Sequence, residues 1–275
     1  MTDDEPLVKV EVADQVATLT INRPKKKNAM SPALHAEMLE RLTELEERSD
    51  FKVLVVTGAG DSFCAGMDLE ECFMNPFEEP ERFSQENKTA QAWFRLLKRF
   101  PVPTVAKVNG WCFGGGVLIV GLCDMAMAAD DVTFGLSEIN FGSFPGGGTT
   151  WAVAHNLGRK HALYLILTGK PFGAEEAERI GLINASVPRS ELDSEIASLA
   201  ETICKKHRTV LVAAKEVYEG THDKTFGESI DWEMAKLYEL SYVTGHDWIT
   251  NALRQFADRE YRPGFESYRL EDRGD

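Results

Sequence analysis

The sequence lacks the features of several large classes of protein. Its 275 residues include 44 acidic and 30 basic side chains, so the formal net charge is −14 at pH 7. A surface that binds nucleic acid or an anionic membrane needs net or clustered positive charge. The one dense basic cluster in the sequence is Lys25-Lys26-Lys27. We therefore expect neither nucleic acid nor a membrane as a partner.

Cysteine motifs, long apolar runs and targeting signals are also missing. The five cysteines contain no CxxC pair and have no metal-ligand spacing with the six histidines, so we predict reduced thiols and no metal site. No apolar run reaches the roughly 20 residues of a membrane-spanning helix. The N-terminus, Met-Thr-Asp-Asp-Glu-Pro, has neither the basic nor the apolar region of a secretory signal. We expect a soluble, cytoplasmic protein.

Strands are predicted in the first part of the chain. Two alternating segments, 8–12 and 16–21, have the pattern of half-buried strands. Three continuous apolar runs, at 53–56, 104–108 and 125–129, are typical of strands covered on both faces. Because helical patterns separate these segments, the expected class is α/β.

Helical patterns have recognisable starting points. One begins at Ser31-Pro32, a capping residue followed by proline at the first helical position. Residues 70–86, rich in Glu, Pro and Phe, are predicted to form a mobile loop before a helix from about Asn87 to Phe100. After Gly148 the chain is predicted to be almost entirely helical. These helices are expected near residues 149–157, 159–168, 174–180, 190–206, 209–218, 226–242 and 246–258.

One carboxylate lies in an apolar segment ahead of a glycine-rich turn. Glu138 is part of the run Thr133-Phe134-Gly135-Leu136-Ser137-Glu138-Ile139-Asn140-Phe141-Gly142. Burial among these apolar side chains raises the pKa of a carboxyl group, as a proton-transferring glutamate at neutral pH requires. The alternative is a glutamate that only caps the following turn.

Three glycine-rich segments are candidates for ligand-binding loops. Residues 53–60 begin like a dinucleotide-binding loop, but Phe63 occupies the place of the third glycine, so no nicotinamide or flavin site is expected. Gly135-Leu136-Ser137-Glu138-Ile139 resembles a nucleophile elbow but has isoleucine in place of the second glycine, which weighs against a serine hydrolase. Residues 109–116 follow a strand and enter a helix, so their backbone N–H groups can bind an oxyanion.

A further segment, Ser62 to Leu69, can bring another backbone N–H to the same place. The order of these segments resembles the crotonase (enoyl-CoA hydratase/isomerase) superfamily over nearly the whole chain. The motifs that carry the resemblance are Asn22-Arg23-Pro24 with Asn28-Ala29, Cys64-Ala65-Gly66-Met67-Asp68, Asn109-Gly110 to Gly116, Ser137-Glu138-Ile139 and Pro145-Gly146-Gly147-Gly148.

Two of these segments, 109–116 and 134–140, most resemble the hydroxycinnamoyl-CoA (feruloyl-CoA) hydratase-lyases. Enzymes of that kind hydrate an aryl-propenoyl thioester and then cleave the adduct to an aromatic aldehyde and acetyl-CoA. The implied fold is a crotonase-like α/β spiral of ββα units over residues 1–200, followed by a helical oligomerisation region over residues 201–275. A homotrimer or hexamer is implied. The apolar residues expected to meet neighbouring subunits are Ile230, Met234, Leu237, Leu240 and Val243.

The resemblance also implies the roles of single residues. The N–H groups of Met67 and Gly115 would bind the thioester oxygen, and Glu138 would transfer the protons. Coenzyme A enters as part of the acyl-CoA substrate, and no separate cofactor is implied. The positions that match its binding path are Lys26, Ala65, Leu69, Ser137 and Phe141.

Three positions of the acyl pocket, Leu118, Cys72 and Met234, depart from the patterns of related enzymes. Leu118 stands where two-carboxylate hydratases have a second glutamate, so the lone Glu138 fits a hydratase-lyase or an enoyl-CoA isomerase. A non-catalytic CoA-binding scaffold is a separate alternative, and the intact Glu138 and oxyanion segments weigh against it. Cys72 and Met234 stand where phenol-recognising hydratase-lyases have tyrosines. The acyl group is therefore expected to be less polar than 4-hydroxycinnamoyl, or to be held by another aromatic residue. The candidates are Trp232, Tyr238 and Tyr242.

Overall fold

The apolar run at residues 53–56 lies in the middle of the larger of two sheets in the computed structural model, which describes residues 5–76 and 78–269. This sheet has the strand order β1-β2-β3-β5-β7-β10. All six residues of β3 are buried, as the prediction of a doubly covered strand requires. The strands are β1 (Val8–Ala13), β2 (Val16–Ile21), β3 (Val53–Gly58), β5 (Thr104–Val108), β7 (Met125–Ala129) and β10 (Ala185–Val187).

The direction of strand pairing within the larger sheet changes once, from antiparallel to parallel. Strands β1 and β2 form an antiparallel hairpin through Asp14 and Gln15, whose φ angles of 50° and 63° suit a two-residue hairpin turn. From β2 to β10 every pairing is parallel. Parallel strands need long crossover connections, and these crossovers carry the second sheet and the helices.

Three of the four short strands of the second sheet directly follow strands of the first. Strands β4, β6 and β8 follow β3, β5 and β7 and pair in parallel, whereas β9 pairs with β8 in the antiparallel sense. The repeated unit is thus strand, strand, helix, which is the predicted crotonase-like spiral. The short strands are β4 (Ser62–Cys64), β6 (Trp111–Phe113), β8 (Thr133–Gly135) and β9 (Phe172–Gly173).

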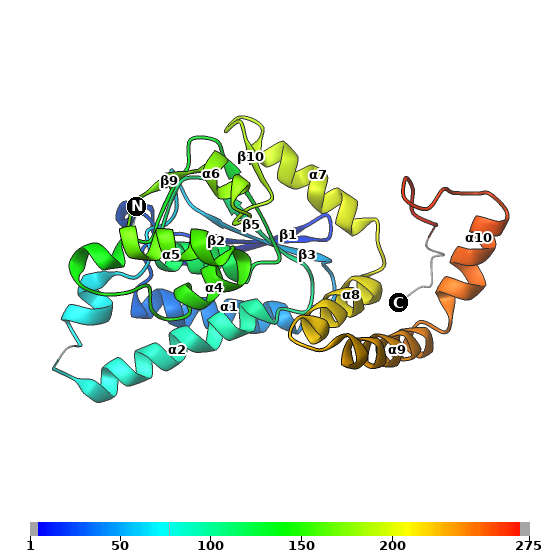
Figure 1. Ribbon diagram of the computed structural model, residues 1–275, viewed down its shortest axis with the longest axis horizontal. Coiled ribbons are helices and arrows are strands. Elements are labelled where there is room, and N and C mark those ends of the chain that lie inside the picture. The colour runs from blue at the N-terminus through cyan, green and yellow to red at the C-terminus, as the bar shows by residue number, and fades with distance from the viewer. Residues whose placement is uncertain (1–4, 77, 270–275) are drawn as a thin grey trace. The chain divides into compact units, whose positions relative to one another are not determined.

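Helix α1 (Pro32–Glu46) begins as predicted. The Ser31 side chain accepts a hydrogen bond from the Leu34 N–H at 3.3 Å, and Pro32 occupies the first turn. The face predicted to be apolar is buried against the neighbouring helix α2 (Figure 1). Its members are Leu34, Met38, Leu42 and Leu45.

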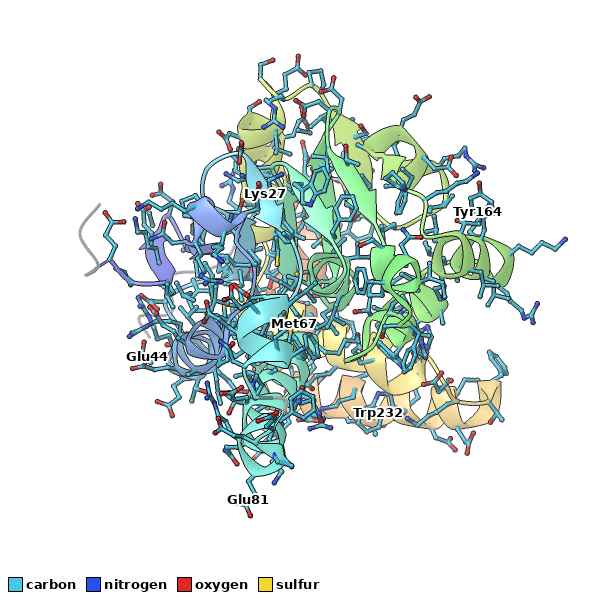
Figure 2. All side chains as sticks on the ribbon, turned by 90° about the vertical axis from the view of Figure 1, so that its left-hand side faces the viewer. Lys27, Glu44, Met67, Glu81, Tyr164 and Trp232 are labelled. Carbon is cyan, nitrogen blue, oxygen red and sulfur yellow. The ribbon has the colours of Figure 1, made fainter. Side chains whose placement is uncertain are left out.

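Helix α2 (Pro80–Lys98) begins seven residues earlier than predicted, so the expectation of a loop up to residue 86 was wrong. Pro80 is preorganised for a first turn, and Glu81 interacts favourably with the helix N-terminus. Figure 2 shows Glu81 at the outer end of this helix. Residues Glu70–Met74 form one π-helical turn, η2. The Glu, Pro and Phe residues on which the prediction of a loop rested are therefore also compatible with the start of a helix.

The chain divides into two units, Met1–Ala200 and Glu201–Asp275. Both sheets belong to the first unit. After the glycine-rich turn at 146–148 the predicted helices are present, together with the short strands β9 and β10, which the pattern did not predict. The helical elements that remain in the first unit are η1 (Pro24–Lys26), α3 (Gly115–Leu122), η3 (Ser137–Phe141), α4 (Thr149–Asn156), α5 (Arg159–Thr168) and α6 (Ala174–Arg179), and α7 (Leu192–Cys204) runs into the second.

The second unit is helical. Helix α9 packs on α8 and starts with a capping box, in which Thr225 and Glu228 satisfy each other's backbone N–H groups. Four of the five apolar residues expected to meet neighbouring subunits are exposed on α9, and Leu240 is partly buried. The helical elements of the second unit are α8 (Arg208–Thr221), α9 (Phe226–Val243), η4 (Trp248–Ala252) and α10 (Leu253–Ala257). Across the described residues, none of the helices combines the length and apolarity needed to cross a bilayer.

Candidate active site

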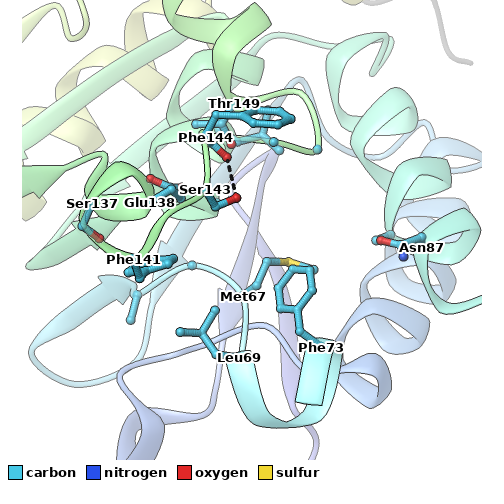
Figure 3. Close-up of a pocket in the computed structure, with 18 of the residues that line it drawn as sticks. Met67, Leu69, Phe73, Asn87, Ser137, Glu138, Phe141, Ser143, Phe144 and Thr149 are labelled. Atoms are coloured by element: carbon cyan, nitrogen blue, oxygen red, sulfur yellow. Dashed lines mark hydrogen bonds between the residues drawn. The ribbon is translucent and has the colours of Figure 1, made fainter. Parts of the chain in front are cut away.

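A cavity of about 750 Å³ lies in the first unit (Figure 3). Its volume falls within the range of small-molecule binding sites. The walls come from the segment after β4, one face of α2, the start of α3 and the segment from η3 to α4. The lining residues are Ala65, Gly66, Met67, Leu69, Phe73, Met74, Asn87, Ala90, Gln91, Phe94, Gly114, Gly115, Leu118, Ser137, Glu138, Phe141, Ser143, Phe144, Gly146, Gly147 and Thr149.

Glu138 is the only acid among these lining residues of the described chain. It lies in η3, directly after β8, and its Oε2 atom is buried without a hydrogen-bond partner among the described residues. Burial raises the pKa of Glu138 above its ordinary value, in the predicted direction. Phe134 and Leu136, which precede Glu138 in the sequence, are fully buried, whereas Ile139 and Phe141 are 38% and 56% exposed. Only part of the apolar segment is therefore buried, and Glu138 itself lines the cavity.

The turn after Glu138 is closed by the backbone. The N–H of Ser143 donates to the Glu138 carbonyl at 3.1 Å, and the N–H of Gly142 donates to the Ile139 carbonyl at 3.3 Å. The carboxylate takes no part in either bond. This arrangement weighs against the alternative in which Glu138 serves only to cap its own turn.

The Met67 N–H is directed away from its nearest neighbouring strand segment. Met30 pairs with Met67 in a parallel bridge and uses both of its own backbone groups, its N–H to the Gly66 carbonyl and its carbonyl to the Asp68 N–H, each at 2.8 Å. In such a bridge the middle residue of the partner segment points its N–H to the other side. The Met67 N–H is thus available on the side of the cavity that Met67 lines.

The Gly115 N–H is free for a different reason. Gly115 is the first residue of α3, so its N–H has no acceptor within the helix. A Cβ added to Gly66 would lie 3.2 Å from the Gly115 nitrogen, which shows how closely the two segments approach. Gly66 and Gly114 have φ angles of +91° and +48°, and only glycine adopts such angles without strain. One N–H group at the start of α3 and one on the segment after β4 are therefore brought close together beside Glu138.

The Asn-Arg-Pro motif supports the Met67 segment from outside the cavity. Arg23 donates to Asp68 at 2.8 Å and to the Ala29 carbonyl at 3.0 Å, and it also pairs with Glu71. Burial opposes the charge on Asp68, yet the hydrogen bonds from Arg23 and from the Glu71 N–H keep its pKa below the ordinary value. This pair ties the start of η2 to the turn after β2. The motif thus has a structural role that sequence reasoning did not assign.

Six of the residues that the resemblance assigned to substrate binding line the cavity together with Glu138. They are Met67, Gly115, Ala65, Leu69, Ser137 and Phe141, and the acyl-pocket residue Leu118 joins them. Figure 3 shows Glu138 and Ser137 on one wall, with Met67 and Leu69 on the segment below them.

Three predicted site residues lie outside this lining. Lys26 is exposed on η1, with its Nζ 3.9 Å from Glu70. The Cys72 thiol is buried and donates to the Met30 carbonyl at 3.2 Å, and burial raises the pKa of Cys72 to about 12, so it stays protonated at neutral pH. Met234 lies on α9 in the second unit, where it is 41% exposed.

Sequence reasoning missed the wall formed by α2. Asn87, Ala90, Gln91 and Phe94 line the cavity at spacings of three and four residues, which place them on one face of a helix. All four residues lie within the helix predicted from about Asn87 to Phe100, but nothing in the local sequence indicated that this face of the helix lines a cavity. Within residues 5–76 and 78–269, no group of three or more His, Cys, Asp or Glu is arranged to hold a metal ion.

Comparison with known proteins gives a consistent answer. The sequence profile of the family described as enoyl-CoA hydratase/isomerase matches residues 11–265. The hydroxycinnamoyl-CoA hydratase-lyase of Pseudomonas fluorescens is 40% identical over 265 residues, which cover 95% of this chain and 96% of that protein. A probable mitochondrial enoyl-CoA hydratase of Dictyostelium discoideum is 33% identical over 86% of this chain and 83% of its own length.

Solved structures agree in fold. An enoyl-CoA hydratase from Bacillus anthracis superposes with a TM-score of 0.84 at 28% identity, covering 92% of this chain and 97% of that chain. Family profile, sequence relatives and structural likeness each extend over most of the chain. This protein therefore belongs to the enoyl-CoA hydratase/isomerase (crotonase) family.

Proposed function

We propose that this protein is a lyase that adds water to the conjugated double bond of an enoyl-CoA thioester. The observation that carries the proposal is the buried, unpartnered carboxylate oxygen of Glu138, which lies in the same cavity as two free backbone N–H groups. The family and the named hydratase relatives support it.

The two N–H groups stabilise the charge that develops during addition. When water attacks the β-carbon of a conjugated thioester, negative charge moves to the thioester oxygen and an enolate forms. Met67 and Gly115 donate to that oxygen, and preorganised donors of this kind lower a barrier by several kcal/mol each. They do so without reorganising, because α3 and the Met30 bridge hold them in place.

Glu138 carries out both proton transfers of the hydration. It removes a proton from the attacking water as the C–O bond forms at the β-carbon, and it returns that proton to the α-carbon as the enolate collapses. Leu118 offers no second carboxylate in the cavity. A raised pKa suits this double role, because the group must both accept and release a proton near neutral pH.

The same groups can carry out a second step on an aryl substrate. Glu138 takes the proton of the β-hydroxyl, the bond between the α- and β-carbons breaks, and an aldehyde leaves. The electron pair of the broken bond forms the enolate of acetyl-CoA, which Met67 and Gly115 hold until it is protonated at carbon. We propose this cleavage because the Pseudomonas fluorescens protein, whose alignment covers 95% of this chain, is a hydroxycinnamoyl-CoA hydratase-lyase.

The remaining parts of the proposal concern the substrate and the assembly. Ala65, Leu69, Ser137 and Phe141 line the path of coenzyme A, with Lys26 at its outer end. The reaction is acid-base chemistry that proceeds without a separate cofactor. The exposed apolar face of α9 forms the contacts of a homotrimer, or of two trimers paired as a hexamer.

A panel of aliphatic and aryl enoyl-CoA thioesters, analysed by mass spectrometry after incubation, tests the function. A hydratase adds the mass of one water to the thioester, and a hydratase-lyase releases acetyl-CoA and an aldehyde. An isomerase, the alternative that the lone carboxylate allows, leaves the mass unchanged and moves the double bond. Binding without any product indicates a scaffold and contradicts the proposal.

A further inference from the structure

A second polar feature faces the cavity from the wall opposite Glu138. Helix α2 places Asn87 one turn before Gln91 on the face that lines the cavity. In Figure 3, Asn87 and Glu138 lie on opposite sides of the cavity, with Met67 and Phe73 between them. An acyl group whose carbonyl is bound at Met67 can extend from there toward α2.

The amide of Asn87 is held in one orientation. Its Nδ2 donates to the Phe83 carbonyl, one turn earlier in the helix, at 2.9 Å. Its Oδ1 accepts no hydrogen bond from the described residues, and Figure 3 shows this oxygen on the side facing the cavity. Gln91 differs, because its side-chain oxygen already accepts from Arg95 at 3.3 Å. Asn87 therefore presents an unused acceptor to a ligand.

Much of the cavity lining is apolar and includes Phe73, Phe94, Leu118 and Phe144. A ligand that fits has an apolar or aromatic middle and a hydrogen-bond donor at its far end. The thiol of Cys72 does not provide a partner for that donor, since it is bound to the Met30 carbonyl outside the lining.

We propose that Asn87 is a specificity-determining residue whose amide oxygen accepts a hydrogen bond from a hydroxyl at the far end of the acyl group. The inference rests on the proposed function, because it requires the thioester oxygen to be bound by Met67 and Gly115. It differs from the expectation from the sequence, in which the acyl group is less polar than 4-hydroxycinnamoyl or is held by Trp232, Tyr238 or Tyr242.

Three aryl thioesters test the role of Asn87: 4-hydroxycinnamoyl-CoA, cinnamoyl-CoA and 4-methoxycinnamoyl-CoA. The first carries a donor, the second carries no polar group, and the third carries an oxygen without a proton. Because one neutral hydrogen bond at a partly solvated site changes an equilibrium by about tenfold at most, the wild type should favour the hydroxyl compound by about five- to tenfold in kcat/KM. The methoxy compound should behave like cinnamoyl-CoA or worse.

The variant Asn87→Leu keeps the size of the side chain and removes the acceptor. We expect it to reduce the ratio of kcat/KM for the hydroxyl compound to kcat/KM for cinnamoyl-CoA to about one. Gln85→Leu is the matched control, because Gln85 is exposed on the same helix and does not line the cavity. This control should retain the preference of the wild type.

A wild-type preference near one, or a preference that Asn87→Leu leaves unchanged, overturns the inference. Crotonyl-CoA, which has no distal group, separates this failure from that of the proposed function. Turnover of crotonyl-CoA with none of the aryl compounds overturns the role of Asn87 and keeps the hydratase. Turnover of none of the four overturns the proposed function itself.

Discussion

Replacing Glu138 by glutamine should lower the activity of the protein and raise its stability at neutral pH. The substitution preserves the shape of the side chain and removes its ability to accept a proton. Since no other acid lines the cavity in the described chain, we expect kcat to fall by about 10²- to 10⁴-fold, the usual contribution of a positioned proton-transfer group. The oxyanion contacts and the apolar walls are unchanged, so KM should stay within a few-fold.

The same variant should be more stable than the wild type at neutral pH. The Oε2 atom of Glu138 is buried and unpartnered, and leaving a buried acceptor without a partner costs about 1–3 kcal/mol, more when it is charged. A neutral amide reduces this cost, because its desolvation is less unfavourable. We expect a gain of about 1 kcal/mol in the free energy of unfolding, or a rise in Tm of about 2–4 °C.

The gain should depend on pH in a defined direction. Burial raises the pKa of Glu138 in the folded state, so the folded protein binds this proton more tightly than the unfolded chain does. Wild-type stability from this group is fully present below the ordinary glutamate pKa of about 4.3 and is lost as the pH rises through the folded value. The variant and the wild type should therefore unfold alike near pH 4 and differ at pH 7. The acid limb of wild-type kcat/KM should likewise lie above the ordinary pKa.

Steady-state kinetics and calorimetry at the two pH values measure these effects. Glu86→Gln is the matched control, since the Oε2 atom of Glu86 is also buried without a partner but Glu86 does not line the cavity. This control should keep its activity within about twofold. A Glu138→Gln enzyme that retains more than about a tenth of wild-type kcat would refute the role of Glu138 in proton transfer. A Glu138→Gln variant that is less stable than the wild type at pH 7 would refute the argument that the buried carboxylate is destabilised by desolvation.

Three further predictions concern the support of the site and the assembly. Gly114→Ala should lower kcat/KM about 100-fold, because its Cβ would lie 2.8 Å from Glu138 Oε1; Gly142→Ala, where nothing lies within 4 Å, should lose only stability. Asp68→Asn should reduce the free energy of unfolding by about 2 kcal/mol, measured by urea titration. That difference should disappear as the pH falls through the lowered pKa of Asp68, and a difference that persists in acid contradicts it. Light scattering should give the mass of three or six chains for the wild type and a smaller one for Leu237→Glu; a single-chain mass for the wild type contradicts the assembly.

Local sequence signals predicted the elements that depend on neighbouring residues. Ser31 with Pro32 located the start of α1, and the apolar run at 53–56 identified a doubly covered strand, as the structure confirms. The boundaries of α4 and α5 lie within one residue of the predicted ones. The direction of the Glu138 pKa shift was also predictable, since Phe134 and Leu136 are its neighbours in the chain.

Other features had no clear local signal. The strands β4, β6 and β8 are three residues long and are held by pairing with one another, which no periodicity over three residues reveals. The start of α2 was obscured by residues that are common to loops and to helix N-termini. The cavity-facing side of α2, including Asn87, lay within the predicted helix, but no local pattern shows that a helix face lines a cavity.

The sequence by itself indicated the family and the α/β class, and it singled out Glu138 as a carboxylate in an apolar segment, because these are carried by motifs of a few contiguous residues each. The tertiary structure alone decided which of the candidate residues share a cavity. The segments of Met67 and Gly115 are distant along the chain and meet through the close approach of Gly66 to Gly115, while Cys72, only five residues from Met67, turns its thiol to the Met30 carbonyl. The distance between two residues in space does not follow from their separation along the chain. In this cavity it is set by the pairing of β4 with β6 and by the packing of α2.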